Sequence, residues 1–514
     1  MATDRRGPRR PATRRNSATA AVDAPRRGAR PCAPTSVPSN TNTANADFDG
    51  DLPEGWTAAR LADAADVQLG KMLDRAKRTR GSPYQYLRNA NVRWGAFDLS
   101  DLFVMPFENH ELDRYAVKSG DLLVCEGGEP GRAAIWNDRR TDIKYQKALL
   151  RVRPNERAIG AWILYALQLD ALRGALEPHF TGSTIKHFPR QAALRYLLPL
   201  PPLAEQKRIV AKVEEVLAHV NAARDHLARI PPLLKRFRQA VLAAACSGEL
   251  TQDWRNENRQ LRSVQSRVDD IQSAEPQQLR VRAAGFSVRN LDLYDLPDGW
   301  AWIKNHCLAV NSPNAICAGP FGTIFKARDF RNAGVPIIFL RHVGEGRYIT
   351  SKPGYMDVTV WNTLHQAYSV FGGELLVTKL GDPPGTACIY PRNIGTAMVT
   401  PDVMKMQVDE RVGVPRYLMH FFNSPNCKRL IEELVFGVTR LRVDLTMFKS
   451  FPIPLPPPEE QHEIVRRVDA LFALADSIEQ RVADATARAN ALTQSTLAKA
   501  FRGELVATEA ELAR

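Results

Sequence analysis

Two short polar sequences, late in each half of the chain, carry side chains suited to binding a nucleic acid. Each begins with Gly-x-Thr and continues with basic residues. They are Gly182-Ser183-Thr184-Ile185-Lys186-His187 and Gly437-Val438-Thr439-Arg440-Leu441-Arg442. Hydroxyl groups and cationic side chains bind phosphate oxygens and base edges through hydrogen bonds, with no covalent step. The chemistry that these residues predict is therefore recognition rather than catalysis.

A second pair of related sequences lies earlier in each half: Leu87-Arg88-Asn89-Ala90-Asn91-Val92 and Leu340-Arg341-His342-Val343. Arginine, amide and hydroxyl side chains are the usual readers of bases. For each candidate the alternative is a solvated surface position, and for His342 a local hydrogen bond within the protein is the favoured interpretation. By residue type and place in the repeat, we expect nucleic-acid contacts from Arg88, Asn91, Arg93, Ser183, Thr184 and Lys186 in the first half, and from Arg341, His342, Arg347, Thr439, Arg440 and Arg442 in the second.

The sequence carries no recognisable catalytic signature. It lacks the glycine-rich dinucleotide and nucleotide loops, the His-Glu-x-x-His motif and any cluster of His and Cys ligands. Asp382-Pro383-Pro384-Gly385 is similar to the Asp/Asn-Pro-Pro-aromatic sequence of DNA amino-methyltransferases, but Gly385 replaces the aromatic residue that would stack on a flipped base. A plain turn is the simpler interpretation. We therefore expect no catalytic residues, no cofactor and no metal in this chain, which disfavours a stand-alone nuclease or methyltransferase.

The composition is that of a globular protein with a basic surface. Of its 514 residues 44% are hydrophobic, and a formal net charge of +14 favours a polyanionic partner. No apolar run reaches the length of about 18 residues that a membrane span requires, so no membrane partner is expected. The seven cysteines are scattered and odd in number. That usage fits a reducing cytoplasm better than a disulfide framework or a zinc site.

Two long helices must position these polar sequences. Apolar residues recur every three or four positions between Ala204 and Cys246, which is the repeat of a coiled-coil seam. We expect two antiparallel helices, with a kink in the first at Pro231-Pro232. The predicted first seam is Ile209, Val213, Val216, Val220, Ala223, Leu227, Ile230, Leu234, Phe237, Val241 and Ala244. Adding 255 (461 − 206) gives the partner seam, whose last two positions break the pattern: Ile464, Val468, Leu471, Ala475, Ile478, Val482, Ala485, Ala489, Leu492, Thr496 and Lys499.

The helix boundaries repeat as well, so the chain is a duplicated unit. Each helix opens with Pro-Leu-Pro-Pro and a Glu-Gln pair and closes with Gly-Glu-Leu, and each globular part opens with a turn that ends at Trp56 or Trp300. These turns are 244 residues apart (300 − 56), so the second globular part is longer by 11 (255 − 244). Short apolar runs between turns predict mixed α/β structure. The two copies otherwise differ, as expected of modules that read different ligands from one frame.

This arrangement resembles the specificity subunit of type I restriction-modification enzymes. The resemblance covers about residues 50 to 506 and rests on PLPPLAEQKRIV with PLPPPEEQHEIV, on ARIPPLLKRFRQAVLAAACSGELTQDWR and on the two tryptophan turns. It implies a bacterial, cytoplasmic protein that reads a split site in double-stranded DNA. It also implies two modification (methyltransferase) subunits and usually two restriction (translocase and nuclease) subunits as partners, with S-adenosylmethionine, ATP and Mg²⁺ bound by those partners.

The fold class that follows is α/β (α+β), with two globular target recognition domains separated by two long antiparallel coiled-coil helices in a pseudo-twofold internal repeat. The alternative is a coiled-coil DNA-binding scaffold or regulator without restriction partners, which leaves the duplication with divergent faces unexplained. The expected boundaries are 1–47 for a disordered Arg- and Pro-rich extension, 48–203 for the first recognition domain, 204–250 for the first spacer helix, 251–291 for a solvated linker, 292–458 for the second recognition domain, 459–506 for the second spacer helix and 507–514 for a tail.

Overall fold

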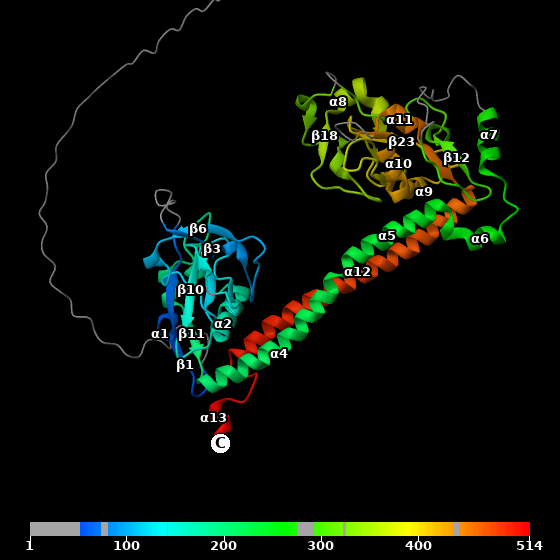
Figure 1. Cartoon of the computed structure of the whole chain (residues 1–514). Helices are drawn as coiled ribbons and strands as arrows, with labels where there is room; N and C mark the ends of the chain where they lie inside the picture. Colours follow the sequence, from blue (N-terminus) through cyan, green and yellow to red (C-terminus); the bar gives the residue numbers. More distant parts are fainter. Residues whose placement is uncertain (1–51, 73–80, 141, 275–290, 322–324, 436–441) are drawn as a thin grey trace, which may run out of the picture.

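The computed structural model describes residues 52–72, 81–140, 142–274, 291–321, 325–435 and 442–514. Two globular parts that mix helices and strands lie at opposite ends of long helices that run side by side (Figure 1). We name residues 52–202 head 1 and residues 291–457 head 2. The mixed α/β class predicted from the sequence is confirmed. The extension predicted at residues 1–47 lies outside the described residues.

Head 1 is built on small sheets. β1 (Thr57–Arg60) pairs with β11 (Leu197–Leu200), the main sheet has the strand order β2-β10-β7-β8, and a further sheet has the order β6-β3-β9. Helix α2 (Gly160–Arg173) packs on the main sheet at β8. The remaining elements are α1 (Leu61–Ala64), β2 (Ala65–Leu69), β3 (Ser82–Leu87), the hairpin β4 (Val92–Arg93) and β5 (Ala96–Phe97), β6 (Phe103–Phe107), β7 (Leu122–Cys125), β8 (Ala133–Ile135), β9 (Lys144–Tyr145), β10 (Leu149–Pro154) and α3 (Arg190–Arg195).

Head 2 repeats the strand pair and the main sheet of head 1, but its further sheet has five strands, in the order β14-β18-β15-β22-β19, instead of three. β12 (Ala301–Lys304) pairs with β24 (Pro452–Leu455), and the main sheet has the order β13-β23-β20-β21. In the further sheet, β15 pairs antiparallel with β18 and parallel with β22, as β3 pairs with β6 and β9. The bounds are β13 (Ile316–Ala318), β14 (Phe330–Arg331), β15 (Val335–Ile338), β16 (Val343–Gly344), β17 (Arg347–Tyr348), β18 (Gly354–Met356), α8 (Val358–Val360), β19 (Ser369–Val370), β20 (Leu375–Thr378), β21 (Ala387–Ile389), β22 (Ala397–Val399), β23 (Val403–Met406), α9 (Pro415–Asn423), α10 (Pro425–Val435) and α11 (Leu445–Ser450).

The additional residues of head 2 are distributed over several places rather than inserted at one. Leu69 and Ala318 share a position in the strand register and are 249 residues apart (318 − 69). Gly120 and Gly373 donate equivalent backbone hydrogen bonds and are 253 apart (373 − 120). The separation therefore grows in steps from 244 at the tryptophan turns to 255 at the long helices. Small loop insertions leave the sheets in register because loops lie at the surface.

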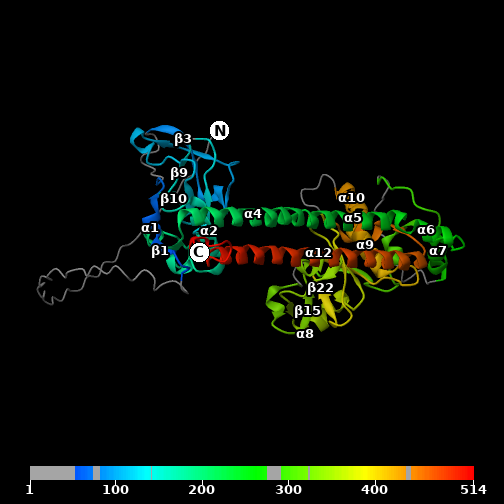
Figure 2. The ribbon, with the colours of Figure 1, turned by 90° about the horizontal axis from the view of Figure 1, so that it is seen from below.

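Three helices form the connection between the heads, and we name them together the rod. α4 (Leu203–Ala228) and α5 (Ile230–Ser247) lie end to end and pack along α12 (Pro458–Ala500), which runs in the opposite direction (Figure 2). Arg229 separates α4 from α5, and Pro231 and Pro232 lie in the first turn of α5. The interruption expected at the prolines is therefore present, because proline is tolerated only at the start of a helix. α12 has no proline at the corresponding place and is continuous.

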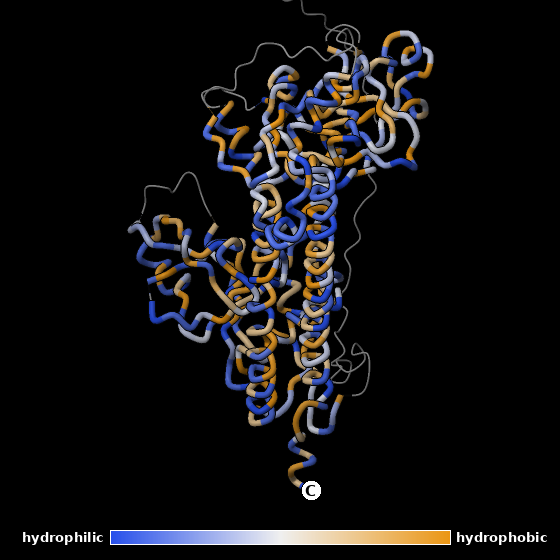
Figure 3. Tube along the Cα trace, turned by 90° about the vertical axis from the view of Figure 1, so that its right-hand side faces the viewer, coloured by the Kyte–Doolittle hydropathy of each residue, from blue (hydrophilic) through white to orange (hydrophobic). Residues whose placement is uncertain are grey.

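Burial in the rod follows the predicted seam at its ends but departs from it in the middle. Hydrophobic and hydrophilic residues are interspersed along the helices on both sides of the rod in Figure 3. Ala223, Phe237 and Leu492 were expected in the seam but are exposed. A straight helix drifts by about 20° per heptad against a 3.5-residue repeat, and the break at Arg229 shifts the phase again. The predicted seam residues that are fully buried are Ile209, Val213, Val220, Leu234, Val241, Ile464, Val468, Ala475 and Thr496.

A Glu-Gln pair ties each head to the helix that follows it. The Glu205 carboxylate accepts a hydrogen bond from the Trp56 indole at 2.7 Å. The Gln206 amide oxygen accepts from the Ile159 backbone N–H at 3.1 Å, and its nitrogen donates to two backbone carbonyls. These bonds join the start of α4 to parts of head 1 that are far from it in sequence. The same bonds in head 2 join Glu460 to Trp300 (2.9 Å) and Gln461 to Val414 (2.7 Å).

Each head is completed by the far end of the opposite long helix. The core of head 1 includes Leu497 and Ala500 from the end of α12, and the Phe501 ring lies 4.3 Å from that of Trp162. The core of head 2 likewise includes residues from the end of α5: Val241, Leu242, Ala245 and Cys246. Each core therefore combines residues from both halves of the chain, because the antiparallel pair brings the end of each long helix to the other helix's head.

The linker at residues 251–291 is only partly as expected. Its described part contains α6 (Gln252–Glu257) and α7 (Val264–Ala274), and Val264 and Val268 of α7 are buried in the core of head 2. Two valines one turn apart are enough to dock a short helix, although they make no sustained apolar stripe. The solvated linker of the prediction is thus corrected for this segment, and residues 275–290 lie outside the described residues.

Candidate nucleic-acid interface

The candidate residues around Arg88 form one compact loop in head 1. A short 3-10 turn, η2 (Asn89–Asn91), leads into the β4-β5 hairpin. Asn91 is 2% exposed, and its side chain accepts from the Arg88 N–H at 2.9 Å and donates to the carbonyls of Asp98 and Asp101 at 3.0 Å. Arg93 is exposed and its ion pair with Asp98 is long, at 3.7 Å. Asn91 therefore holds the loop, whereas Arg93 is free to contact a ligand.

The Arg88 guanidinium is held in place rather than mobile. It donates to the Asp101 carboxylate at 2.7 Å and lies 3.6 Å from the centre of the Phe103 ring. The Asp101 carboxylate is exposed, so the pair lies at the surface of head 1. An arginine that is already oriented by an aromatic face and a carboxylate loses little freedom when it binds a base or a phosphate.

His342 occupies in head 2 the place that Asn91 has in head 1. It ends the 3-10 turn η10 (Leu340–His342), is 2% exposed, and its Nδ1 accepts from the Phe339 N–H at 3.2 Å. Burial, and then the nearby Arg341 cation, lower the pKa of His342, so the ring is neutral and can accept this bond. The local hydrogen bond favoured from the sequence is present. Arg341 lies over the Phe339 ring at 4.2 Å, and both Arg341 and Arg347 are exposed.

The first Gly-x-Thr sequence is a closed surface loop. Thr181 and His187 exchange backbone hydrogen bonds at 2.8 and 2.9 Å, and Gly182 has φ +92° with no room for a Cβ beside the Ile185 carbonyl. Ser183, Thr184 and Lys186 are exposed on this loop. In the second copy Arg442 is described and exposed, whereas Thr439 and Arg440 lie outside the described residues.

The two candidate loops of head 1 meet at Gly127, which follows β7. The Asn89 side-chain amide donates to the Gly127 carbonyl at 3.0 Å, and Gly127 also forms an antiparallel bridge with His187. Asn89, Gly127 and His187 were not among the predicted contacts. The signal available was the Gly127-Gly128 pair directly after an apolar strand, because glycine there allows another backbone to approach closely. One corner of head 1 thus gathers both sets of predicted residues.

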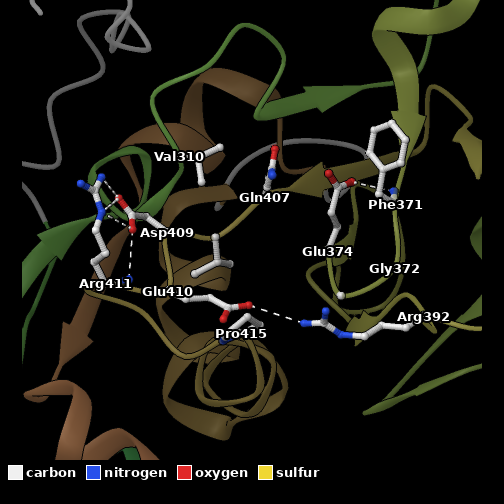
Figure 4. Close-up of a pocket in the computed structure, with 12 residues that line it drawn as sticks. Val310, Phe371, Gly372, Glu374, Arg392, Gln407, Asp409, Glu410, Arg411 and Pro415 are labelled. Atoms are coloured by element: carbon white, nitrogen blue, oxygen red, sulfur yellow. Dashed lines mark hydrogen bonds and ion pairs between the residues drawn. The ribbon is translucent and has the colours of Figure 1, made fainter. Parts of the chain in front are cut away.

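A separate pocket of about 620 Å³ lies in head 2 (Figure 4) and contains none of the predicted residues. Two of its charged side chains lie 3.6 Å apart, Arg392 and Glu410, and its Glu374 is bound at 3.1 Å by Lys405, which lies outside the lining. Burial raises the pKa of Glu374. We assign no ligand to this pocket. The lining residues are Val310, Phe371, Gly372, Gly373, Glu374, Arg392, Gln407, Val408, Asp409, Glu410, Arg411 and Pro415.

Other features bear on cofactors and partners. Within the described residues, His, Cys, Asp and Glu side chains form no group of three that could hold a metal ion. Six described cysteines have free thiols. Among the described helices, none has the length and apolar composition that crossing a bilayer would need.

The chain is similar to several known proteins. Residues 401–485 match the family described as the type I restriction modification DNA specificity domain. The EcoBI specificity subunit of Escherichia coli is 33% identical over 76% of this chain and 75% of its own length, and the EcoKI subunit of strain K12 is 26% identical over 89% and 91%. A solved chain of a type I R-M system covers 88% of this chain with a TM-score of 0.60, and the HsdS subunit of Thermoanaerobacter tengcongensis covers 90% with a TM-score of 0.50. Both solved chains are 18% identical to this one and covered in full, which establishes likeness of fold.

Proposed function

The chain belongs to the specificity subunits of type I restriction enzymes, and from this premise we propose that head 1 and head 2 are its two target recognition domains, each reading one half of a bipartite, asymmetric DNA site. Specificity subunits are DNA-recognition components and not enzymes in themselves. The observation that carries the proposal is the repeated scaffold with different exposed side chains. In the Asn91 and His342 loops, for example, the named side chain accepts from the backbone N–H three residues earlier, but the exposed cation is Arg93 on one head and Arg341 on the other.

The rod would act as the ruler between the half-sites. Because α4 and α5 pair with α12 over their length, the distance between the heads is set by the number of residues in the rod. α12 has 43 residues and spans about 65 Å at ~1.5 Å per residue. A rigid connection of that kind fixes the gap between two half-sites, as dimer geometry does in symmetric DNA readers.

Type I specificity subunits act together with methyltransferase and restriction subunits on DNA. We place the docking surface for two modification subunits on the rod, and expect S-adenosylmethionine, ATP and Mg²⁺ to be bound by partner subunits in the bacterial cytoplasm. Exposed apolar side chains on the rod support this place, since solvated helices rarely carry several of them. Arg208, by contrast, binds the chain's own Glu509 at 2.5 Å. The exposed apolar residues are Leu233, Phe237, Leu474 and Leu492.

Methylation mapping tests the proposal most directly. The chain is co-expressed with a type I modification subunit from the same genome in a host that lacks DNA methylation, and modified adenines are located by single-molecule sequencing. We expect one non-palindromic motif with two half-sites and a fixed gap, and no modification when the chain is expressed alone. A palindromic motif, or modification by the chain alone, would contradict the proposal. DNA binding without any dependence of modification on this chain would favour the scaffold or regulator alternative.

A further inference from the structure

One position of the internal repeat carries opposite charges in the two heads. Glu126 directly follows β7 and Lys379 directly follows β20. The backbone N–H of each donates across the sheet at 2.9 Å, to Ala148 and Asp402 respectively. Their surroundings are equivalent, so the repeat has placed a carboxylate in head 1 where head 2 has an ammonium group.

The neighbours of this position are equivalent as well. The carbonyl of Glu126 accepts from the N–H of Phe188, and that of Lys379 accepts from the N–H of Val443. The residues just before these donors are therefore equivalent, and they are His187 in head 1 and Arg442 in head 2. The Glu126 carboxylate lies 3.3 Å from the His187 ring nitrogen, so head 1 presents an acceptor paired with an imidazole.

An exposed apolar residue marks the same region of each head. Leu69 and Ala318 share a strand register, so Met72 and Phe321, three residues later in each case, are equivalent. Met72 is 61% exposed and Phe321 is 54% exposed. Phe321 lies beside both cations of head 2, with the Lys379 ammonium 4.5 Å and the Arg442 guanidinium 5.8 Å from its ring centre.

The Lys379 ammonium group has an aromatic neighbour, Phe321, but no ion pair among the described residues. The residue is 2% exposed, yet among the described residues no acceptor binds its ammonium group and no carboxylate lies within 4.0 Å of it. Burial, and then the neighbouring Arg442 cation, lower the pKa of Lys379. A buried charge is costly unless it is paired, and one shared aromatic face compensates only in part. Asp402 and Asp444 raise the pKa of Lys379 in turn, but neither carboxylate is ion-paired with the ammonium group, so the cation can still take an anionic partner.

We propose that Lys379, Arg442 and Phe321 contact the DNA half-site of head 2, and that Glu126 with His187 makes the corresponding contact in head 1. In this arrangement Lys379 binds a backbone phosphate, Arg442 reads the acceptor edge of a guanine, and Phe321 packs against the sugar or base beside it. In head 1 the Glu126 carboxylate accepts from an exocyclic amino group of a base. The inference rests on the proposed function and explains how two copies of one scaffold select different bases.

Lys379→Met tests the phosphate contact, because methionine fills the same space without the charge. Binding of the full chain to a duplex that carries its mapped target is measured over a range of salt concentrations. We expect weaker binding, a slope of log K against log [salt] that is smaller by about one, and a Tm that is unchanged or higher. Lys304→Met, at an exposed lysine of β12, is the control and should leave the slope unchanged. A lower Tm with an unchanged slope would overturn the role of Lys379.

Base selection tests the other residues. The full chain and its Arg442→Gln and Glu126→Gln variants are each used to select binders from a duplex library randomised in both half-sites. Arg442→Gln should relax one position of the head 2 half-site by about 5- to 150-fold and leave the other half-site and the gap unchanged. Glu126→Gln should do the reverse. Unchanged selectivity in both variants, or equal loss at both half-sites, overturns the inference alone, whereas failure of the unaltered chain to select a bipartite site overturns the proposed function.

Discussion

At the scale of single residues, the side chains that repeat most faithfully serve the scaffold. Gln206 and Gln461 each accept one backbone hydrogen bond and donate two at the junction of head and helix. Both are fully buried. A buried amide that is satisfied on every side fixes the angle between two elements, because no other arrangement pairs all the groups. The Glu-Gln motif is therefore the same in both copies because it fixes the orientation of each head on its helix.

We expect Gln461→Ala to destabilise head 2 by about 2 to 4 kcal/mol, because it leaves the Val414 N–H and two carbonyls unpaired in the core. Thermal unfolding followed by circular dichroism measures the change. Gln480→Ala, on the exposed side of the same helix, is the matched control and should shift the stability by less than about 0.5 kcal/mol. Equal loss of stability in the two variants would contradict the role given to the hydrogen bonds of Gln461.

A second prediction at this scale concerns His420 on α9. Burial, and then the Arg416 cation, lower its pKa to about 4, while Asp469, 3.9 Å from the ring, is already bound by Arg416. Below an unfolded pKa of 6.5 the unfolded state takes up the proton first. The contribution of the neutral His420 ring to the free energy of unfolding is therefore fully present above pH 6.5. It decreases as the pH drops toward 4, by about 2 kcal/mol at pH 5.

Urea unfolding at pH 7.5 and pH 5 checks the His420 prediction. The difference in unfolding free energy between the two pH values should shrink by about that amount in His420→Gln, which cannot take up a proton. An exposed histidine such as His219 supplies the control, since His219→Gln should leave the difference as it is. A pH dependence that is the same in all three proteins would contradict the role given to His420.

At the scale of elements, the rod is held by polar contacts where its apolar seam weakens. Arg224 of α4 donates to Asn490 at 2.8 Å and to Thr493 at 2.9 Å. On the other side of the break, Arg238 of α5 binds Asp476 at 2.5 Å and a second carboxylate of α12. Such directional contacts fix the register of two helices, as polar groups do within coiled-coil seams. These contacts therefore define a single register for the helices of the proposed ruler, and with it one distance between the heads.

Shortening the paired helices α4 and α12 together should shorten the gap between the half-sites. Removing residues 221–227 together with 487–493 deletes Arg224 and its partners at once and shortens the rod by about 10 Å. We expect the gap in the methylated motif to shrink by about three base pairs, with both half-sites unchanged. Removing 487–493 alone is the control, because it misaligns the pair and should abolish the bipartite site. An unchanged gap after the paired deletion would refute the ruler.

At the scale of the whole molecule, each head depends on chain segments from both halves. Glu205 accepts from the Glu509 N–H at 3.0 Å at one end of the rod, and Glu460 accepts from the Thr251 hydroxyl at 2.7 Å at the other. The start of each long helix is thus covered by the segment that follows the end of the other. Loss of one end of the chain should therefore act on the head that is distant from it in sequence.

Truncation tests this interdependence. Removing residues 501–514 takes Phe501, Leu505 and Val506 from the core of head 1 together with α13 (Glu509–Leu512), but removes nothing from head 2. We expect faster amide hydrogen exchange in β1 and β11 of head 1 and unchanged exchange in β12 and β24. Removing only 510–514 is the milder control. Loosening confined to head 2, or to neither head, would contradict the packing described.

Much of the framework could be predicted from the sequence because it is periodic and repeated. The seam positions, the paired prolines and the duplicated Glu-Gln motif predicted two paired long helices, an interruption of the first at Pro231-Pro232 and globular parts of mixed α/β structure. The departures lie where the sequence signal is weak. The exposure of Phe237 depends on the helix phase after the break, and the docking of α7 depends on only two valines.

The candidate site likewise has features that the sequence indicated and features that it did not. Residue types and repeat landmarks were sufficient to propose Arg88, Arg93 and Arg442 as DNA contacts, because the chemistry of cationic side chains is evident from the sequence, and these three assignments stay predictions. They could not separate Asn91 and His342, which are buried in their own loops, from residues free to bind. Nor could they show Lys379, which stands alone in the sequence and meets Phe321 and Arg442 only in the fold. Periodicity and type are properties of the chain, whereas burial and the pairing of charges arise when distant segments pack together.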